Sequence, residues 1–203
     1  MTDVQTDTPV IDRPVLTFPE EVSEWVRELY SQADFILEYG SGGSTVLASE
    51  MTGKTVFSVE SDPGWCQMMQ DYFDHAGTTS DVHLHYANIG KVGKWGRPKT
   101  HDAWDRYHRY PNSVWDLPEF KAPDLVLVDG RFRAACVITA LLRTERPLTL
   151  LFDDYTERRR YHVVEDFVAR KETRGRMVRF EIEPTDLPRT KLTEILRLYT
   201  KTF

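Results

Sequence analysis

Acidic residues follow directly on apolar or β-rich runs at several points of this sequence. They are Glu38, Glu60, Asp129 and the pair Asp153-Asp154. The carboxyl ends of parallel strands meet at one edge of a sheet, which is where open α/β folds bind ligands. Carboxylates at that edge can accept hydrogen bonds from ligand hydroxyls, bind a cation or take up a proton. The pattern therefore predicts a ligand site built from several strand ends.

A glycine-rich loop follows the first of these runs. From Glu38 to Thr45 the sequence reads Glu-Tyr-Gly-Ser-Gly-Gly-Ser-Thr. Glycine lets the backbone turn sharply and approach a ligand closely, and the helical pattern that opens at Ser44 offers free N–H groups. The spacing departs from the dinucleotide fingerprint, because Thr45 stands at its third glycine position and an acid precedes the first. We expect a nucleotide site of another kind; a plain turn between a strand and a helix is the alternative.

The pattern E-x-G-x-G-G-S-T resembles the first motif of the class I S-adenosylmethionine-dependent methyltransferases. In that family the loop holds the methionine end of the cofactor, and the acidic residue reaches its ammonium group. The resemblance implies S-adenosylmethionine as cofactor, with Asn88 and Ile89 flanking the adenine, although a lone Asn after a strand is often a turn former. The run V-D-G-R-F-R from Val128 adds some similarity to sugar-acid O-methyltransferases. The loop residues expected to bind the cofactor are Glu38, Gly40, Ser41, Gly42, Ser44 and Thr45.

Glu60 lies about 20 residues beyond Gly40, where an acidic side chain commonly binds both ribose hydroxyls. We expect Glu60 and the adjacent Ser61 to contact the cofactor. Asp62 precedes Pro63, which makes it a good cap for the next helix. The acidic run thus predicts both a ribose contact and a helix start.

Methylation of an oxygen requires that its proton is removed or its oxyanion stabilised. One device is a divalent metal held by Asp129, Asp153 and Asp154. Metal-dependent catechol-type methyltransferases carry Asp-Asn where this chain has Asp-Asp, which counts against a metal. The other device is a side-chain base, Asp153, Asp154 or His162, with Asp129 beside both the cofactor and the acceptor. Helix capping, a hydrogen bond at the sheet end and a plain helix-face position are the structural alternatives for these residues.

The arginine run at 158–160 follows this acidic group. It is either a solvated face or a site for a carboxylate or phosphate on the acceptor. An acidic small molecule or a uronic sugar would then be the substrate. The chain lacks an N-P-P-Y-like motif, which favours oxygen over nitrogen as the methylated atom. A binding module without catalysis and an NAD-dependent oxidoreductase are the competing functions.

Alternating strand and helix patterns position these residues. They predict an α/β fold: a Rossmann-like, doubly wound, mostly parallel seven-stranded sheet with an antiparallel strand near one edge. The strand at 82–87 is expected at an edge because one of its faces is more polar. The last two strands are expected to pair as a hairpin. Helices are predicted at 19–31, from 44, 65–75, 131–144 and 161–169, and strands at 35–37, 55–59, 82–87, 123–128, 148–152, 177–182 and 194–200.

The sequence predicts one domain over 19–203, preceded by a flexible arm over 1–18. Residues 90–122 break the strand–helix rhythm with many glycines, prolines and aromatics, so we expect a lid over the acceptor site; a structural subdomain or an oligomer contact is the alternative. A net charge of −6 argues against a nucleic-acid partner. No apolar run is long enough for a membrane span, so a cytoplasmic protein is expected. Cys66 and Cys136 suggest no disulfide framework.

Overall fold

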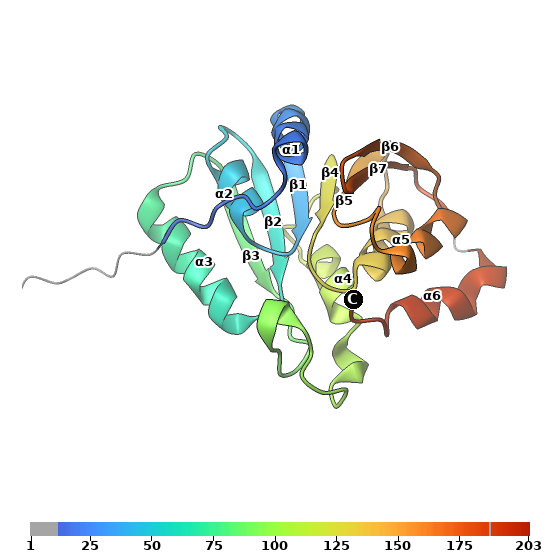
Figure 1. The fold of residues 1–203 in the computed structure, drawn as a ribbon. Helices are drawn as coiled ribbons and strands as arrows, with labels where there is room; N and C mark the ends of the chain where they lie inside the picture. Colours follow the sequence, from blue (N-terminus) through green and yellow to red (C-terminus); the bar gives the residue numbers. More distant parts are fainter. Residues whose placement is uncertain (1–11, 187) are drawn as a thin grey trace, which may run out of the picture.

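The computed structural model describes residues 12–186 and 188–203 (Figure 1). The short apolar runs of the sequence form the strands of one sheet, because β-branched and aromatic residues suit a pleated, buried surface. The strands are β1 Phe35–Tyr39, β2 Thr55–Glu60, β3 Asp81–Tyr86, β4 Leu125–Val128, β5 Leu148–Phe152, β6 Arg170–Arg174 and β7 Met177–Ile182. The α-helices are α1 Glu20–Gln32, α2 Gly43–Ser49, α3 Pro63–Ala76, α4 Arg109–Asn112, α5 Arg133–Arg143 and α6 Leu192–Leu198, and short 3-10 turns span 94–96, 104–106, 113–116, 159–166 and 189–191.

The strand order in the sheet is β3-β2-β1-β4-β5-β7-β6. The first five strands in that order are parallel, and β7 runs antiparallel to both β5 and β6. The predicted fold class is therefore confirmed, including β3 at an edge and an antiparallel strand beside the other edge. The chain passes from the β3 side back across the sheet between β1 and β4, which is the topological switch point where such folds bind ligands.

Helices cover both faces of the sheet. The central strand β4 is buried throughout, and its neighbour β1 is buried at every residue but the first. Alternate residues of β4 enter different core clusters: Val126 packs with α5, whereas Leu125 and Leu127 pack with α1. That division follows from the two-residue period of a strand. In Figure 1 the chain extends from α3 beside β3 at one end of the sheet to β6, β7 and α6 at the other. No helix among residues 12–186 and 188–203 is long and apolar enough to cross a membrane.

The C-terminal segment differs from the expectation. Residues 194–200 were expected as a strand, but residues 194–198 belong to the helix α6 and 199–200 form a turn after it. Ile195 and Leu198, three residues apart, are the buried residues of this helix. The seventh strand is instead β6, which forms the hairpin with β7. Its sequence Arg-Lys-Glu-Thr-Arg is mostly exposed, as charged edge strands are, and it therefore shows no apolar alternation. The helix expected at 161–169 is a run of 3-10 turns over 159–166.

The segment before α1 contacts the domain. Residues 1–11 of the predicted arm lie outside the described residues. Arg13 pairs with Glu50 at 2.8 Å, and a Cβ placed on Gly43 would lie 2.2 Å from the Val15 carbonyl. The backbone of residues 12–18 therefore crosses directly over the start of α2.

The insertion at 90–122 has two parts. Tyr107, Tyr110 and Val114 are buried in the main core, and the Tyr39 hydroxyl donates to the Pro111 carbonyl at 2.6 Å. The earlier part is more open, with Trp95 76% exposed. The second half of the insertion is thus part of the domain core, while the first half lies at the surface.

Candidate active site

A cavity of about 870 Å³ lies over the carboxyl ends of β1, β2 and β4. Its volume falls in the range of small-molecule and cofactor sites. Three strand-end segments line it: the glycine loop after β1, the Glu60–Asp62 turn and residues 129–131 after β4. The remaining described residues that line it come from the N-terminal segment 12–18, from α3 (Trp65 and Met68) and from the insertion (Trp95, Gly96 and Tyr110).

The loops after β1 and β4 touch each other through glycines. Gly40 has a φ of +107°, and a Cβ on it would lie 2.9 Å from the Cα of Gly130. A Cβ on Gly130 would lie 2.0 Å from the Tyr110 hydroxyl and 2.8 Å from the Tyr39 carbonyl oxygen. Only glycine fits at these two positions. The floor of the cavity is therefore exposed backbone, which a ligand can approach closely.

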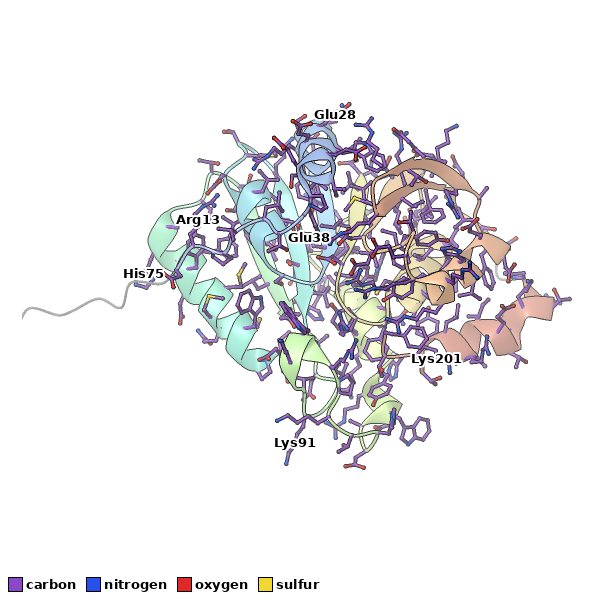
Figure 2. The ribbon with its side chains drawn as sticks, viewed as in Figure 1. Arg13, Glu28, Glu38, His75, Lys91 and Lys201 are labelled. Carbon is purple, nitrogen blue, oxygen red and sulfur yellow. The ribbon has the colours of Figure 1, made fainter. Side chains whose placement is uncertain are left out.

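Glu38 lies beneath the glycine loop, not in the cavity. It is fully buried and is not among the described residues that line the cavity; Figure 2 shows it in the interior, between α1 and the sheet. Its Oε1 accepts from the Tyr30 hydroxyl at 2.6 Å, and its Oε2 accepts from the Thr45 and Ser58 hydroxyls. Burial raises the pKa of Glu38, although these donors oppose the shift.

The Glu38 carboxylate thereby fixes the shape of the loop. Thr45, itself fully buried, links Glu38 to the loop backbone, because its hydroxyl oxygen accepts the Gly42 N–H at 3.0 Å. Ser41 is tied to Ser58 by a hydroxyl pair at 2.7 Å. We expected Glu38 and Thr45 to contact a ligand. In the structure both lie beneath the loop, and their contact with a ligand stays a prediction. Gly40, Ser41, Gly42 and Ser44 line the cavity.

Glu60 closes the opposite side of the cavity and is 9% exposed. Its Oε1 accepts the backbone N–H groups of Ser61 at 2.5 Å and Asp62 at 2.8 Å. The Ser61 hydroxyl donates to the Gly96 carbonyl at 3.2 Å, which ties the insertion to this turn. Burial raises the pKa of Glu60, against the lowering effect of the two N–H donors. Both N–H groups reach Oε1, which fixes the carboxylate in place at the cavity wall.

Asp129, Asp153 and Asp154 bring carboxylate oxygens within 4.8 Å of one another. Arginines already neutralise them: three guanidinium groups lie against three carboxylates, and Asp153 is fully buried beneath its partner. A divalent cation would have to displace these pairs, so the donor set does not fit a metal centre. The ion pairs are Arg176 with Asp153 at 2.7 Å, Arg133 with Asp129 at 2.9 Å and with Asp154 at 3.4 Å, and Arg158 with Asp154 at 2.7 Å.

Asp129 is the member of this group that lines the cavity. Its side chain is one-third exposed. Burial, together with the negative charges of Asp153 and Asp154, raises its pKa to about 7, and the positive charge of Arg133 works in the opposite direction. A carboxylate with a pKa near neutrality can accept a proton from a ligand and release it again.

Three further predicted site residues, His162, Asn88 and Ile89, do not line the cavity, and neither do Asp153 and Asp154. The His162 Nε2 is 3.2 Å from the Tyr155 carbonyl oxygen, and its ring stacks on that tyrosine at 4.8 Å. The Asn88 side chain accepts the Gly90 N–H at 3.0 Å, which is the turn-forming role left open by the sequence. Ile89 is fully buried in the core. Their roles at a ligand remain predictions. Asn88 lines a second hollow of about 490 Å³, which shares Asp62 with the first cavity.

Sequence reasoning missed Arg131 and the N-terminal segment as cavity-lining elements. Arg131 stands two residues after the strand-end acid Asp129, a position that alone could have nominated it. The arginine run that was nominated serves other contacts. Arg158 pairs with Asp154 at 2.7 Å, and Arg160 lies over the Phe203 ring at 4.6 Å.

Comparison with solved structures gives strong similarity to one protein and fold-level likeness to others. A methyltransferase-like protein from Silicibacter pomeroyi DSS-3 is 43% identical, with a TM-score of 0.90 over 93% of this chain and 98% of that chain. The O-methyltransferase TomG from Streptomyces achromogenes, solved in complex with SAM, is 16% identical, with a TM-score of 0.53 over 84% of this chain and 82% of that chain. An O-methyltransferase from Bacillus cereus in complex with SAH is 13% identical, with a TM-score of 0.53 over 86% and 84% of the two chains. No family model and no curated protein matches the sequence.

Proposed function

Because this chain belongs to the class I S-adenosylmethionine-dependent methyltransferase superfamily, we propose that it transfers a methyl group from S-adenosylmethionine to an oxygen atom of a small molecule. Membership confirms the resemblance drawn from the glycine loop. The observation that carries the proposal is the cavity at the β1/β4 switch point. It has a bare-backbone loop on one side and the fixed Glu60 carboxylate on the other.

The cavity fits the cofactor in two respects. Gly42 has extended backbone, and no heavy atom of the described residues lies within 4 Å of a Cβ built on it. The backbone of the loop is thus accessible from the cavity at Gly42. The amino-acid end of the cofactor would lie there, against Ser41, Gly42 and Ser44. On the far side, Glu60 Oε2 is an acceptor for ribose hydroxyls, with Ser61 beside it. When bound, the cofactor supplies an electrophilic methyl group on a sulfonium centre.

Asp129 is the group that we assign to proton transfer. It lines the cavity at the end of β4, beside the glycine contact between the two loops. Its pKa of about 7 lets it remove the proton of an acceptor hydroxyl near neutral pH. Arg133 holds the carboxylate in position at 2.9 Å. Asp154 acts indirectly, through Arg133, which also pairs with Asp129. Asp153 pairs with Arg176, which also lies 3.5 Å from Asp154.

Two of the compared proteins are O-methyltransferases, which supports oxygen as the methylated atom. The Asp129 carboxylate also supports oxygen, because a hydroxyl acceptor has to lose its proton and a carboxylate base can take it. The first half of the insertion, with Trp95 and Gly96 on the cavity wall, would cover the bound acceptor. A cavity of about 870 Å³ lies in the range of small-molecule sites, which suits a small-molecule acceptor.

Binding and transfer are tested separately. Thermal unfolding is followed with S-adenosylhomocysteine and, as the matched alternative, with NAD. We expect stabilisation by S-adenosylhomocysteine and none by NAD; stabilisation by NAD alone would instead make the chain an oxidoreductase or a nucleotide-binding module. Formation of S-adenosylhomocysteine from S-adenosylmethionine is then followed with a panel of hydroxylated acids. Turnover by the wild type that Asp129→Asn abolishes, with cofactor binding retained, supports the catalytic assignment.

A further inference from the structure

Arg131 is a buried cation that has no counter-charge among residues 12–186 and 188–203. It is 8% exposed and lines the cavity. Within residues 12–186 and 188–203, its Nε has no hydrogen-bond partner, and no carboxylate forms an ion pair with it. Arg133 and Arg176, which lie nearby in the same site, are both paired. An unpaired buried charge is costly, so its retention at a cavity wall points to a ligand that completes it.

The surroundings of Arg131 reinforce the need for an anion. Burial and the like charges of Arg133 and Arg97 lower the pKa of its guanidinium, while the phenols of Tyr110 and Tyr161 raise it. The Tyr161 hydroxyl is itself buried, and no hydrogen-bond partner for it lies in the described part of the chain. Arg131 and Tyr161 thus each carry a buried donor atom that lacks an acceptor among the described residues. Of the two side chains, only Arg131 lines the cavity, so the guanidinium is the group that a ligand anion can reach.

The position of Arg131 separates it from the expected nucleoside contacts. It follows β4, and its neighbours come from the insertion (Tyr110 and Arg97) and from the 159–166 turn after β5. Glu60 follows β2, which lies two strands away in the sheet. At the usual spacing of strands this is about 10 Å. A ligand whose ribose binds Glu60 thus leaves the part of the cavity next to the end of β4 to a second molecule.

We propose that Arg131 binds an oxyanion, a carboxylate or a phosphate, on the methyl acceptor. The inference rests on the proposed methyltransferase function and names its substrate class: a small hydroxylated acid. The planar guanidinium group can form bidentate hydrogen bonds with a carboxylate or a phosphate. Asp129, two residues earlier, lines the same cavity and would take the hydroxyl proton. The arginine run at 158–160 does not serve this purpose, since Arg158 already pairs with Asp154.

The test compares Arg131→Met with the wild type, with Arg131→Lys as the charge-preserving control. Acetate and inorganic phosphate are titrated at constant ionic strength, with and without saturating S-adenosylhomocysteine, while thermal unfolding is followed. We expect a saturable rise in Tm for the wild type, a smaller rise for Arg131→Lys and none for Arg131→Met. Arg131→Met should fold at least as stably as the wild type without ligand, because it removes an uncompensated charge.

Affinity for S-adenosylhomocysteine separates this proposal from the proposed function. Arg131→Met should bind it within about threefold of the wild type; failure of the wild type to bind it at all would refute the methyltransferase function and not the anion site. The anion site is refuted if acetate and phosphate leave the wild type unchanged, or shift wild type and Arg131→Met equally. Weaker binding of S-adenosylhomocysteine but unchanged binding of 5′-methylthioadenosine, which lacks the amino-acid end, would assign Arg131 to the cofactor carboxylate instead.

Discussion

Replacing Glu60 by Gln tests the cofactor side of the cavity with little change in shape. The amide oxygen of Gln can still accept the Ser61 and Asp62 N–H groups that now reach Oε1 at 2.5 and 2.8 Å. The amide nitrogen replaces Oε2 and donates where the carboxylate accepts. The substitution therefore removes the proposed acceptor for the ribose while leaving the turn after β2 intact.

The expected loss can be worked from this geometry. A hydrogen bond to a charged group contributes about 1.5–3 kcal/mol, which corresponds to a roughly 10- to 150-fold rise in the Kd for S-adenosylhomocysteine. Folding stability should be unchanged or slightly higher. Burial raises the pKa of Glu60, which means that the folded protein already disfavours the charged carboxylate that Gln replaces.

Isothermal titration calorimetry with S-adenosylhomocysteine measures the change, and 5′-methylthioadenosine should lose the same factor because it keeps the ribose. Glu28→Gln is the matched control: Glu28 lies at the far end of α1 (Figure 2), where it is half-exposed and pairs with Arg174 at 3.4 Å. It should leave the Kd unchanged. A Kd for Glu60→Gln within about twofold of the wild type would refute the ribose assignment.

Four further substitutions probe the rest of the site. Gly42→Leu should change stability by no more than about 0.5 kcal/mol yet abolish S-adenosylhomocysteine binding in calorimetry, since its Cβ meets only open space. Gly43→Ala should weaken that binding and cost about 1–3 kcal/mol in denaturant unfolding, because its Cβ would lie 2.2 Å from the Val15 carbonyl. Glu38→Ala should lower the free energy of unfolding by about 3 kcal/mol in the same measurement, since it leaves the buried Tyr30 hydroxyl without its acceptor. A loss below about 1 kcal/mol would contradict the supporting role of Glu38. The wild-type kcat should rise with pH through about 7 as Asp129 loses its proton, and Asp129→Asn should remove both the activity and that dependence; an unchanged pH profile would exclude Asp129 as the base.

Local patterns predicted much of the fold and of the candidate site. The buried parallel strands carry continuous apolar runs, and acids at their ends must converge because parallel strands end at one edge. Glu60 and Asp129 accordingly line the cavity with the glycine loop. These features are encoded within a few consecutive residues, so a single sequence reveals them.

The remaining features depend on contacts between distant segments. β6 is a charged edge strand whose pairing with β7 leaves no apolar alternation. Glu38 has the sequence position of a ligand-binding acid, but the Tyr30 hydroxyl, from a helix that precedes it, bonds it in the core. The isolation of Arg131 is visible only when every neighbouring carboxylate has been placed. Sequence patterns alone do not predict which charged side chains remain unpaired after folding.

The central claim is that the cavity between the glycine loop and Glu60 binds S-adenosylmethionine. A crystal structure of the protein with S-adenosylhomocysteine tests it most directly. We expect the amino-acid end of the ligand against Ser41–Ser44, under residues 12–18, and both ribose hydroxyls about 3 Å from the Glu60 carboxylate. A ligand bound elsewhere, or a ribose that does not reach Glu60, would contradict the account.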